Sequence, residues 1–388
     1  MNEIILFYVL ALVALVIGIA IIPMTFKEST PIKMFYHHYF ARKPLIWIIF
    51  IVLTSWSLIL YKQQEEFPVW SIIPLVITGI ALILTYKIHP ESAFKAIDYP
   101  KFTDDITSIP IDIDKEIAVI EYEGIIKCYP LDYVIHHHIV NDRFGSKIVA
   151  LTYCAMCRSV IPFDVTEIGP LFVAALKNGN MVVADRKTKT FFQQSTFKSM
   201  IGKLHPTELT MIPFQVLSWS DVKKTIPNPN VVKVSKKDFR KFELPIPGAW
   251  EKVVSGEFVP GLSKKNRDET FPARTRIIGI IDDSINEKIG YLRKEILAKK
   301  VVLNQENGFF LIGNFNTINA FKDSINNSKL NISLTNDELI DENSGTRWNI
   351  RGKYISGQLN KNLEPIIVSD EYWFSWKKFK SKSKLIRL

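Results

Sequence analysis

The stretch Lys147-Ile-Val-Ala-Leu-Thr-Tyr-Cys-Ala-Met-Cys-Arg-Ser-Val-Ile-Pro-Phe-Asp164 places a Cys-x-x-Cys motif between two apolar, β-branched runs. Short runs of this composition, here residues 148–153 and 159–163, favour buried strands over helices. The two cysteines, Cys154 and Cys157, are therefore predicted to lie on the turn that joins two strands. Thiols at this spacing can form a disulfide with each other or bind one metal ion from two sides.

The chain divides into an apolar N-terminal part and a longer part with the composition of a soluble domain. Its 388 residues are 47% hydrophobic and 12% aromatic, which is ample for a folded core and exceeds one typical domain. Residues 1–88 hold nearly all of the long apolar runs. We therefore expect residues 1–88 to be a membrane anchor and residues 100–388 to carry the function.

Three uncharged runs, at residues 4–24, 45–61 and 70–86, are candidates for membrane-spanning helices. The first is long enough to cross a bilayer, and the other two lie at the short end of the spanning range. No Asp, Glu, Lys, Arg or His lies inside a run, so we do not expect transport or proton relay by this part. Its expected role is integral anchorage in the membrane.

The charges around these runs predict the orientation of the protein. Basic residues gather between the first and second runs, at Lys27, Lys33, Arg42 and Lys43. The connection between the second and third runs has only Lys62 beside two glutamates. The positive-inside rule then places the first connection and the large domain in the cytoplasm. If the short second run did not insert, the domain would instead face the exported side.

Charge and cysteine content exclude several classes of function. The net charge is +10, but the lysines are scattered and form no basic groove with interleaved aromatics. We interpret them as a solvated surface and predict no nucleic-acid partner. With three cysteines, the chain is neither a disulfide-stapled scaffold nor a four-cysteine zinc site. It also has no phosphate loop, Rossmann glycine pattern or Ser-His-Asp signature.

Local signals after residue 110 predict a mostly β, α+β fold. Glu123-Gly124 and Asn178-Gly179 are typical of two-residue hairpin turns. Residues 130–140 predict a short helix, and Ser218 is placed to cap a helix that runs through Lys224. Cys128 is expected to be a buried strand residue.

Paired segments indicate that this β-rich domain is internally duplicated. Arg276-Ile-Ile-Gly-Ile-Ile resembles Glu116-Ile-Ala-Val-Ile-Glu, and the segment from Asp341 parallels the segment from Asp185. Such pairs lie about 155 to 162 residues apart. We infer copy one at 110–237, a turn-rich connection at 238–275 and copy two at 276–388. Copy two has no cysteine, so any thiol chemistry belongs to copy one.

Several segments resemble the domain of unknown function 3179 family: Leu151-Thr-Tyr-Cys-Ala-Met-Cys-Arg-Ser, Asp185-Arg-Lys-Thr, and Trp373-Phe-Ser-Trp. The resemblance covers most of residues 110–388. The family has no settled activity, but some relatives are described as selenoproteins, which implies redox chemistry at the cysteine motif. The resemblance also implies that members are often exported. His137 falls on the family's recurrent histidine, whereas Arg158 stands where a glycine is common.

Three hypotheses for function follow. The first is thiol redox chemistry in which one of Cys154 and Cys157 attacks and the other resolves, with Arg158 and His137 lowering a thiol pKa. The second is a site for a transition metal such as zinc or copper, formed by Cys154, Cys157 and His137. The third is a non-catalytic binding or sensing module. The sequence leaves open whether there is any cofactor, which redox or protein partner is involved, and which cysteine attacks.

Overall fold

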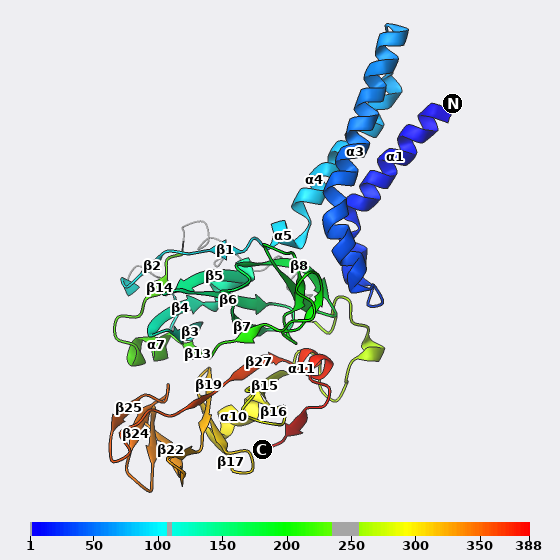
Figure 1. Cartoon of the computed structure of the whole chain (residues 1–388). Coiled ribbons are helices and arrows are strands. Elements are labelled where there is room, and N and C mark those ends of the chain that lie inside the picture. The colour runs from blue at the N-terminus through cyan, green and yellow to red at the C-terminus, as the bar shows by residue number, and fades with distance from the viewer. Residues whose placement is uncertain (1, 107–110, 235–255) are drawn as a thin grey trace.

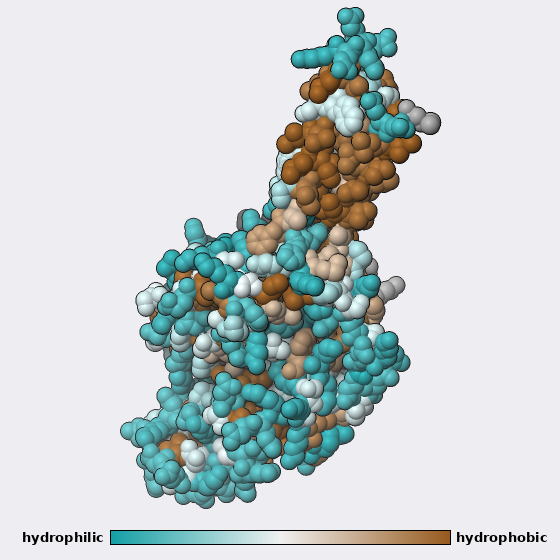
Figure 2. Space-filling model, turned by 45° about the vertical axis from the view of Figure 1, so that its right-hand side comes forward, coloured by the Kyte–Doolittle hydropathy of each residue, from teal (hydrophilic) through white to brown (hydrophobic). Residues whose placement is uncertain are grey.

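The computed structural model describes residues 2–106, 111–234 and 256–388, and shows long helices standing on a β-rich body (Figure 1). The long helices are α1 (Asn2–Ile19), α3 (Ile32–Gln64) and α4 (Ile72–Lys87). Within the described residues, three helical segments are long and apolar enough to cross a membrane, as predicted. Figure 2 shows hydrophobic surface along the middle of the bundle, with hydrophilic residues at its far end and a mostly hydrophilic body. These helices indicate a membrane protein.

Helix α3 extends well beyond the predicted run 45–61. It begins after Pro31 and continues through Pro44 without ending. Its first part carries aromatic side chains that pack on the body, because Tyr36 contacts Phe191 and Tyr39 contacts Phe172. This part of α3 is therefore supported by packing on a folded surface rather than by burial in lipid.

The ends of the helices fall into two groups (Figure 1). The N-terminus and the α3–α4 connection lie at the end away from the body. The short α2 (Ile21–Phe26), the start of α3 and the end of α4 lie at the body. There Arg42 of α3 pairs with Glu91 of α5 (Pro90–Ala93), with 3.1 Å between the guanidinium and carboxylate atoms. The basic connection between the first two apolar runs is thus at the same end of the bundle as the body.

The first half of the body, from residue 97 to residue 232, contains a sheet that carries the cysteine motif. Its order is β1 (Ile97–Asp98), β5 (Ile139–Phe144), β6 (Lys147–Cys154), β7 (Ser159–Asp164) and β12 (Thr210–Met211). Strands β6 and β7 form an antiparallel hairpin whose last pair is Cys154 and Ser159. The prediction that the motif lies on a turn between two buried strands is confirmed.

Two further sheets complete this half. One has the order β13 (Gln215–Ser218), β3 (Glu116–Tyr122), β4 (Ile125–Pro130), β14 (Val231–Val232) and β2 (Phe102–Thr103). The other has the order β11 (Ser199–Ile201), β10 (Phe191–Gln193), β9 (Asn180–Asp185) and β8 (Leu171–Lys177). Both predicted hairpin turns are confirmed: β3 and β4 meet at Glu123-Gly124, and β8 and β9 meet at Asn178-Gly179.

The helices of the first half were predicted with unequal accuracy. Helix α7 (Trp219–Thr225) begins as expected, because the Ser218 side chain accepts a hydrogen bond from the Asp221 backbone N–H. Helix α6 (Leu131–His137) is shorter than the predicted 130–140. His138 has a positive φ of 59°, and the chain then enters β5, where Ile139 pairs with Thr152 of β6. Strand pairing holds the β-branched residues after His138 in an extended conformation, although the helical spacing had placed them in the helix.

The second half of the body is also β-rich. One sheet is β27 (Val368–Tyr372), β15 (Arg276–Ile280), β16 (Ile289–Leu292) and β28 (Lys384–Ile386). A second sheet is β17 (Val301–Asn304), β18 (Phe309–Asn314), β19 (Thr317–Lys322) and β26 (Pro365–Ile366). The outer sheets are β20 (Ser324–Ile325) with β21 (Ser328–Lys329), and β22 (Ile332–Thr335), β23 (Glu338–Asp341), β24 (Arg347–Asn349) and β25 (Tyr354–Ser356). The helices are α10 (Arg293–Lys299) and α11 (Trp373–Phe379).

Helix α11 packs an apolar face on the β15–β16 hairpin. Trp373 and Trp376 are both buried, against Ile277 and Leu292. The Trp376 ring lies directly over Gly279, where an added Cβ would meet its Cζ3 atom at 1.9 Å. Glycine is needed here for the close approach of a large ring rather than for an unusual φ.

Matching local structures in the two halves support the proposed duplication. Asp185 accepts hydrogen bonds from the backbone N–H groups of Thr188 and Thr190, and Asp341 accepts one from Ser344 in the corresponding turn. Each aspartate is the last residue of its strand and holds the turn that follows. The duplication itself stays a prediction, as do the domain boundaries. Much of the predicted connection 238–275 falls on residues 235–255, which lie outside the described residues.

Candidate functional site

The cysteine motif forms a buried turn at the end of the β6–β7 hairpin. Cys154 is the last residue of β6, and the turn ends at Arg158, whose positive φ of 60° returns the chain into β7. Cys154 is 2% exposed and Cys157 is fully buried. Both are free thiols, and the two side chains hydrogen bond to each other. The structure therefore brings together the two cysteines that the sequence singled out.

Polar side chains from two strands, and one from the residue that follows a third, lie around Cys157. The Asn180 side-chain amide donates to the Cys157 Sγ over 3.0 Å, and the Ser159 hydroxyl lies 3.2 Å from the same sulfur. The Gln194 Oε1 atom accepts a hydrogen bond from the Asn180 amide and lies 2.8 Å from the Ser159 hydroxyl oxygen, whose single proton can point to Gln194 or to the Cys157 sulfur. Asn180 begins β9, and Gln194 follows β10, so the site is assembled from strands distant in sequence.

These contacts separate the acidities of the two thiols. Burial opposes ionisation of Cys157, but hydrogen bonds from Cys154, Ser159 and Asn180 outweigh it and lower its pKa to about 7. Burial dominates at Cys154, whose pKa is raised well above the ordinary value for a thiol. The pair thus has one thiol poised to become a thiolate near neutral pH and one that remains protonated.

Cys154 lines a pocket beside the turn, and Cys157 does not. The other residues of this pocket wall are Pro90, Phe94, His138, Ala155, Met156, Val173, Ala175, Leu176 and Met181. The wall is almost entirely apolar apart from His138 and the thiol. The His138 ring stacks on Phe94 with 4.1 Å between the ring centroids.

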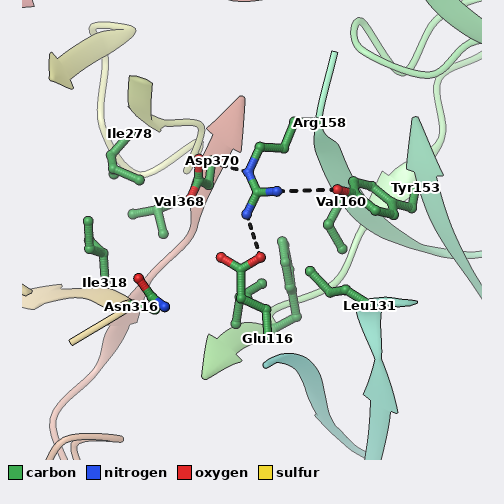
Figure 3. Close-up of a pocket in the computed structure, with 12 residues that line it drawn as sticks. Glu116, Leu131, Tyr153, Arg158, Val160, Ile278, Asn316, Ile318, Val368 and Asp370 are labelled. Atoms are coloured by element: carbon green, nitrogen blue, oxygen red, sulfur yellow. Dashed lines mark hydrogen bonds and ion pairs between the residues drawn. The ribbon is translucent and has the colours of Figure 1, made fainter. Parts of the chain in front are cut away.

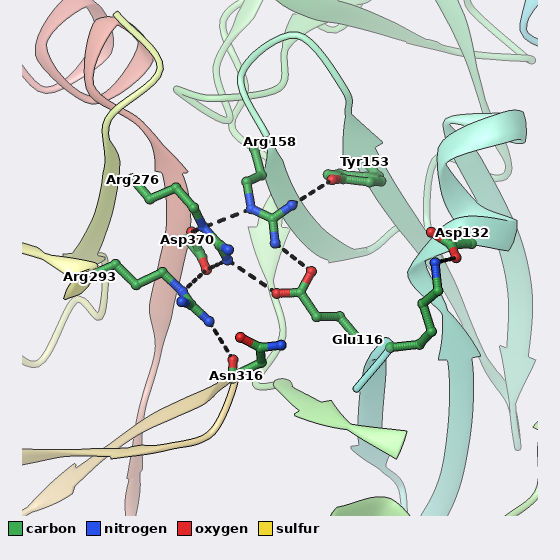
Figure 4. Close-up of polar contacts among 9 residues, drawn as sticks. Glu116, Asp132, Tyr153, Arg158, Arg276, Arg293, Asn316 and Asp370 are labelled. Carbon is green, nitrogen blue, oxygen red and sulfur yellow. Dashed lines mark hydrogen bonds and ion pairs between the residues drawn. The ribbon is translucent and has the colours of Figure 1, made fainter. Parts of the chain in front are cut away.

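Arg158 and His137, which were predicted to lower a thiol pKa, contact groups other than the thiols. The Arg158 guanidinium pairs with Glu116 and Asp370 and donates to the Tyr153 hydroxyl, as Figures 3 and 4 show. The His137 Nδ1 atom lies 3.0 Å from the Lys95 carbonyl oxygen. The largest contributions to the pKa of Cys157 come from other residues. The effect of Arg158 and His137 on a thiol pKa therefore stays a prediction.

Sequence reasoning missed the residues that do contact the thiols or interact with them. Ser159 is adjacent to the motif, but Asn180 follows it by tens of residues and carries no local signal. His138 could not be separated from its two histidine neighbours. Arg274 interacts electrostatically with both cysteines and donates to the Met156 carbonyl. It lies in the turn-rich segment, which gave no reason to connect it with the motif.

The metal hypothesis finds no ligand set in the described part of the chain. There, no group of three His, Cys, Asp or Glu side chains comes together closely enough to hold a metal ion. Cys128 is buried in β4, as predicted, and burial raises its pKa to about 12. We therefore do not build a function on the set Cys154, Cys157 and His137.

A network of ion pairs joins the two halves of the body beside the thiol turn (Figure 4). Glu116 of β3 contacts Arg276 of β15 over 3.1 Å, and Asp370 of β27 contacts Arg293 of α10 over 3.1 Å. Arg276 also pairs with Asp370, and Arg158 pairs with both carboxylates. Burial alone would raise the pKa of Asp370, but the three guanidinium groups lower it below its ordinary value.

The network forms the polar end of a pocket between the halves (Figure 3). Apolar side chains from both halves line the rest, including Leu131, Val160, Ile278, Ile318 and Val368. The pocket touches the thiol turn through Arg158, and neither cysteine lines it. We interpret the network as a structural joint, because each of its charges has an opposite charge beside it.

Comparison with known proteins yields one match. The family model described as protein of unknown function (DUF3179) matches residues 92–383. No curated protein and no solved structure matches the chain.

Replacing Ser159 by Ala should raise the pKa of Cys157 above about 7, because it removes the hydroxyl group whose proton turns from Gln194 to the sulfur when Cys157 ionises. A hydrogen bond to a charged group contributes about 1.5–3 kcal/mol, which corresponds to roughly one to two pKa units. The thiolate fraction at neutral pH should then fall. Ultraviolet absorbance of the thiolate against pH measures this, with the full chain in detergent under reductant.

The matched control for that titration is Ser195→Ala. Ser195 is also buried in this region, and its hydroxyl has no hydrogen-bond partner, so its removal should leave the titration unchanged. An unchanged curve for Ser159→Ala, or equal shifts in both variants, would contradict the assignment.

Replacing Asp370 by Asn should destabilise the protein by about 2 to 4 kcal/mol, because Arg158, Arg276 and Arg293 lose their shared counter-charge. This loss of stability is smaller than that expected for a fully buried ion pair, because the Asp370 side chain is 22% exposed. Denaturant unfolding of the detergent-solubilised chain measures the loss.

Asp337→Asn is the control for the network. Asp337 also pairs across the two halves, with Lys224 at 2.8 Å, but both side chains are at least one-third exposed. Its loss should cost no more than about 1 kcal/mol. Equal effects of the two variants would show that the network is not the joint between the halves.

Proposed function

Because the chain belongs to the DUF3179 family of proteins of unknown function, its chemistry has to be inferred from its own side chains, and we propose that it is a membrane-anchored thiol oxidoreductase. The observation that carries the proposal is the unequal pair of buried thiols. Cys157 has hydrogen bonds that favour the thiolate, whereas Cys154 is kept protonated by burial and faces a pocket.

This asymmetry suits dithiol–disulfide exchange between the two cysteines. In the reduced pair, the Cys157 thiolate is the nucleophile that can close an S–S bond to Cys154 once Cys154 has reacted with an acceptor. In the reverse direction a nucleophile attacks Cys154, and Cys157 leaves as a thiolate, which its low pKa favours. Overall, two thiols lose two electrons and two protons, and one S–S bond forms.

The surroundings of the pair are consistent with this role and differ from a thioredoxin-type site. The residues after Cys157 form strand β7, so no helix N-terminus stabilises the thiolate. Hydrogen bonds from Ser159 and Asn180 stabilise the thiolate instead. The predicted contribution of Arg158 and His137 is not needed for the proposal.

Oxidation and mass measurement test the proposed pair. The purified full chain should lose two hydrogens reversibly when it is treated with the thiol oxidant diamide and then with dithiothreitol. Cys154→Ser and Cys157→Ser should each abolish this intramolecular change.

Cys128→Ser should retain the change, because Cys128 lies on another strand with a pKa of about 12. The proposal fails if the wild-type pair cannot be oxidised, or if oxidation requires Cys128. A pure binding or sensing module would keep its ligand affinity in the Cys154→Ser variant.

We also propose that the body lies on the cytoplasmic side. Lys27 and Lys33 lie beside the α2–α3 connection, Lys43 and Arg42 lie in the first part of α3, and Lys87 ends α4. Figure 1 shows these helix ends at the body. The opposite end carries Lys62 together with Glu65 and Glu66. This imbalance favours a cytoplasmic body by the positive-inside rule.

Protease added to sealed vesicles tests the orientation. Inside-out vesicles should lose the body to digestion, and right-side-out vesicles should protect it. The opposite pattern would place the thiols on the exported side, where they would be oxidised at rest.

A further inference from the structure

A further cavity lies between the two halves of the body, and none of the described residues that line it belongs to the thiol turn. The first half contributes Val119, Glu121 and Gln215 to its wall, and the second half contributes Arg351 and Lys353. The cavity has a volume of about 230 Å³. A cavity of about 150 Å³ can hold benzene, so this one has room for a small ring with a polar substituent.

Much of the cavity wall is apolar. The apolar side chains include Val119, Phe214, Leu363, Ile366 and Ile367. Leu363 and Ile366 are buried in core clusters of the second half, so packing behind the wall holds this part of it in place. Such a wall favours the apolar group of a ligand, because binding removes that group from water.

A tight turn presents two cations to the cavity. Arg351 and Lys353 follow β24, and their backbone N–H groups donate to the Asn349 side-chain oxygen over 2.9 and 3.2 Å. Gly352 lies between them and has a φ of 77°, which residues with a side chain rarely adopt. The turn therefore fixes where the two charged side chains start, and both reach the same cavity.

One carboxylate faces these two cations. The Glu121 Oε2 atom accepts from Arg351 Nη2 over 2.9 Å, and its Oε1 atom accepts from Lys353 Nζ over 2.8 Å. Gln215, which accepts from Arg351 Nε over 3.2 Å, is neutral. The charged groups among the described residues of the wall therefore leave one positive charge without a counter-charge.

This positive charge is held largely out of water. The Arg351 side chain is 3% exposed, and burial lowers its pKa below the ordinary value although Glu121 opposes this. Its Nη1 group has no acceptor among the described residues, and the Lys353 ammonium donates only one of its hydrogens there. Donors therefore remain for a second anion, which would offset the hydration that Arg351 has lost.

We propose that this cavity binds an organic anion that has one carboxylate and a compact apolar group, such as an aromatic ring. The ligand carboxylate accepts hydrogen bonds from Arg351 Nη1 and Lys353 Nζ and supplies the missing counter-charge. Its apolar group lies against Phe214 and Ile366. An inorganic anion would leave the apolar wall unused, and a neutral ring would leave the charge uncompensated. The inference does not rest on the proposed thiol chemistry, because none of the three cysteines lines the cavity.

Binding is measured with para-fluorobenzoate, whose fluorine NMR signal broadens when it exchanges with the full chain in phosphatidylcholine nanodiscs. Empty nanodiscs are the blank. The neutral para-fluorobenzamide should bind at least about tenfold more weakly, because it brings no charge to Arg351 and Lys353. Acetate and phosphate lack the ring, so they should displace para-fluorobenzoate only at concentrations at least about tenfold higher than benzoate needs.

Two variants should change the affinity in opposite directions. Lys353→Gln removes one of the two cations and should weaken binding about fivefold, as expected for a partly exposed ion pair. Glu121→Gln removes the carboxylate that competes for the same donors and should strengthen binding about fivefold or more.

Lys224→Gln is the matched control. Lys224 also pairs across the two halves, with Asp337, but it does not line the cavity. Its replacement removes the same charge and should leave the affinity for para-fluorobenzoate unchanged. Cys154→Ser should also bind like the wild type, which separates this test from the test of the thiol pair.

Several outcomes would overturn the inference. They are no binding at millimolar concentration, equal binding of the acid and the amide, equal displacement by phosphate and benzoate, or the same affinity in Lys353→Gln and Lys224→Gln. Unchanged or weaker binding in a folded Glu121→Gln variant would also overturn it. If Glu121→Gln does not fold, the amide and Lys353→Gln decide the question.

Discussion

The backbone hydrogen bond from Tyr372 to the Cys157 carbonyl, 3.0 Å long, fixes the thiol turn against strand β27 of the second half. The neighbouring residues of β27 then serve the two sides of that turn differently. Asp370 joins the ion-pair network with Arg158, whereas Glu371 acts on Cys157 and opposes its ionisation. The second half has no cysteine, yet it positions and electrostatically adjusts the thiol pair of the first.

The β8–β9 hairpin has a comparable double role. One face contributes Val173 and Met181 to the core around the cysteines, and the other contributes Phe172 and Val182 to the cluster beneath the membrane helices. Strand alternation sends successive side chains to opposite faces, so one hairpin can separate the thiol site from the helix roots and also join them. The closeness of the thiol site to the roots of the apolar helices is thus a consequence of sheet geometry.

The site shows where prediction from sequence succeeds and where it stops. The position of Cys154 and Cys157 on a strand-to-strand turn followed from two β-branched runs, and Cys128 was correctly expected to be buried. Arg158 is next to Cys157 in the chain, but its left-handed backbone directs its guanidinium toward Glu116 and Asp370. The sequence therefore predicted the turn correctly, but the position of Arg158 next to Cys157 did not predict where its guanidinium group would lie.

The amino-acid pattern alone was sufficient for the apolar anchor, the hairpins, the capped helix after Ser218 and the cysteine turn, because each depends on residues a few positions apart. The surroundings of the turn depend on Asn180, Gln194 and His138, which come from different elements and reach the turn only when the sheets pack. Only the tertiary structure decides that Cys157 has the lower pKa and that Cys154 lines a pocket. The reason is that hydrogen bonding and desolvation depend on neighbours in space rather than along the chain.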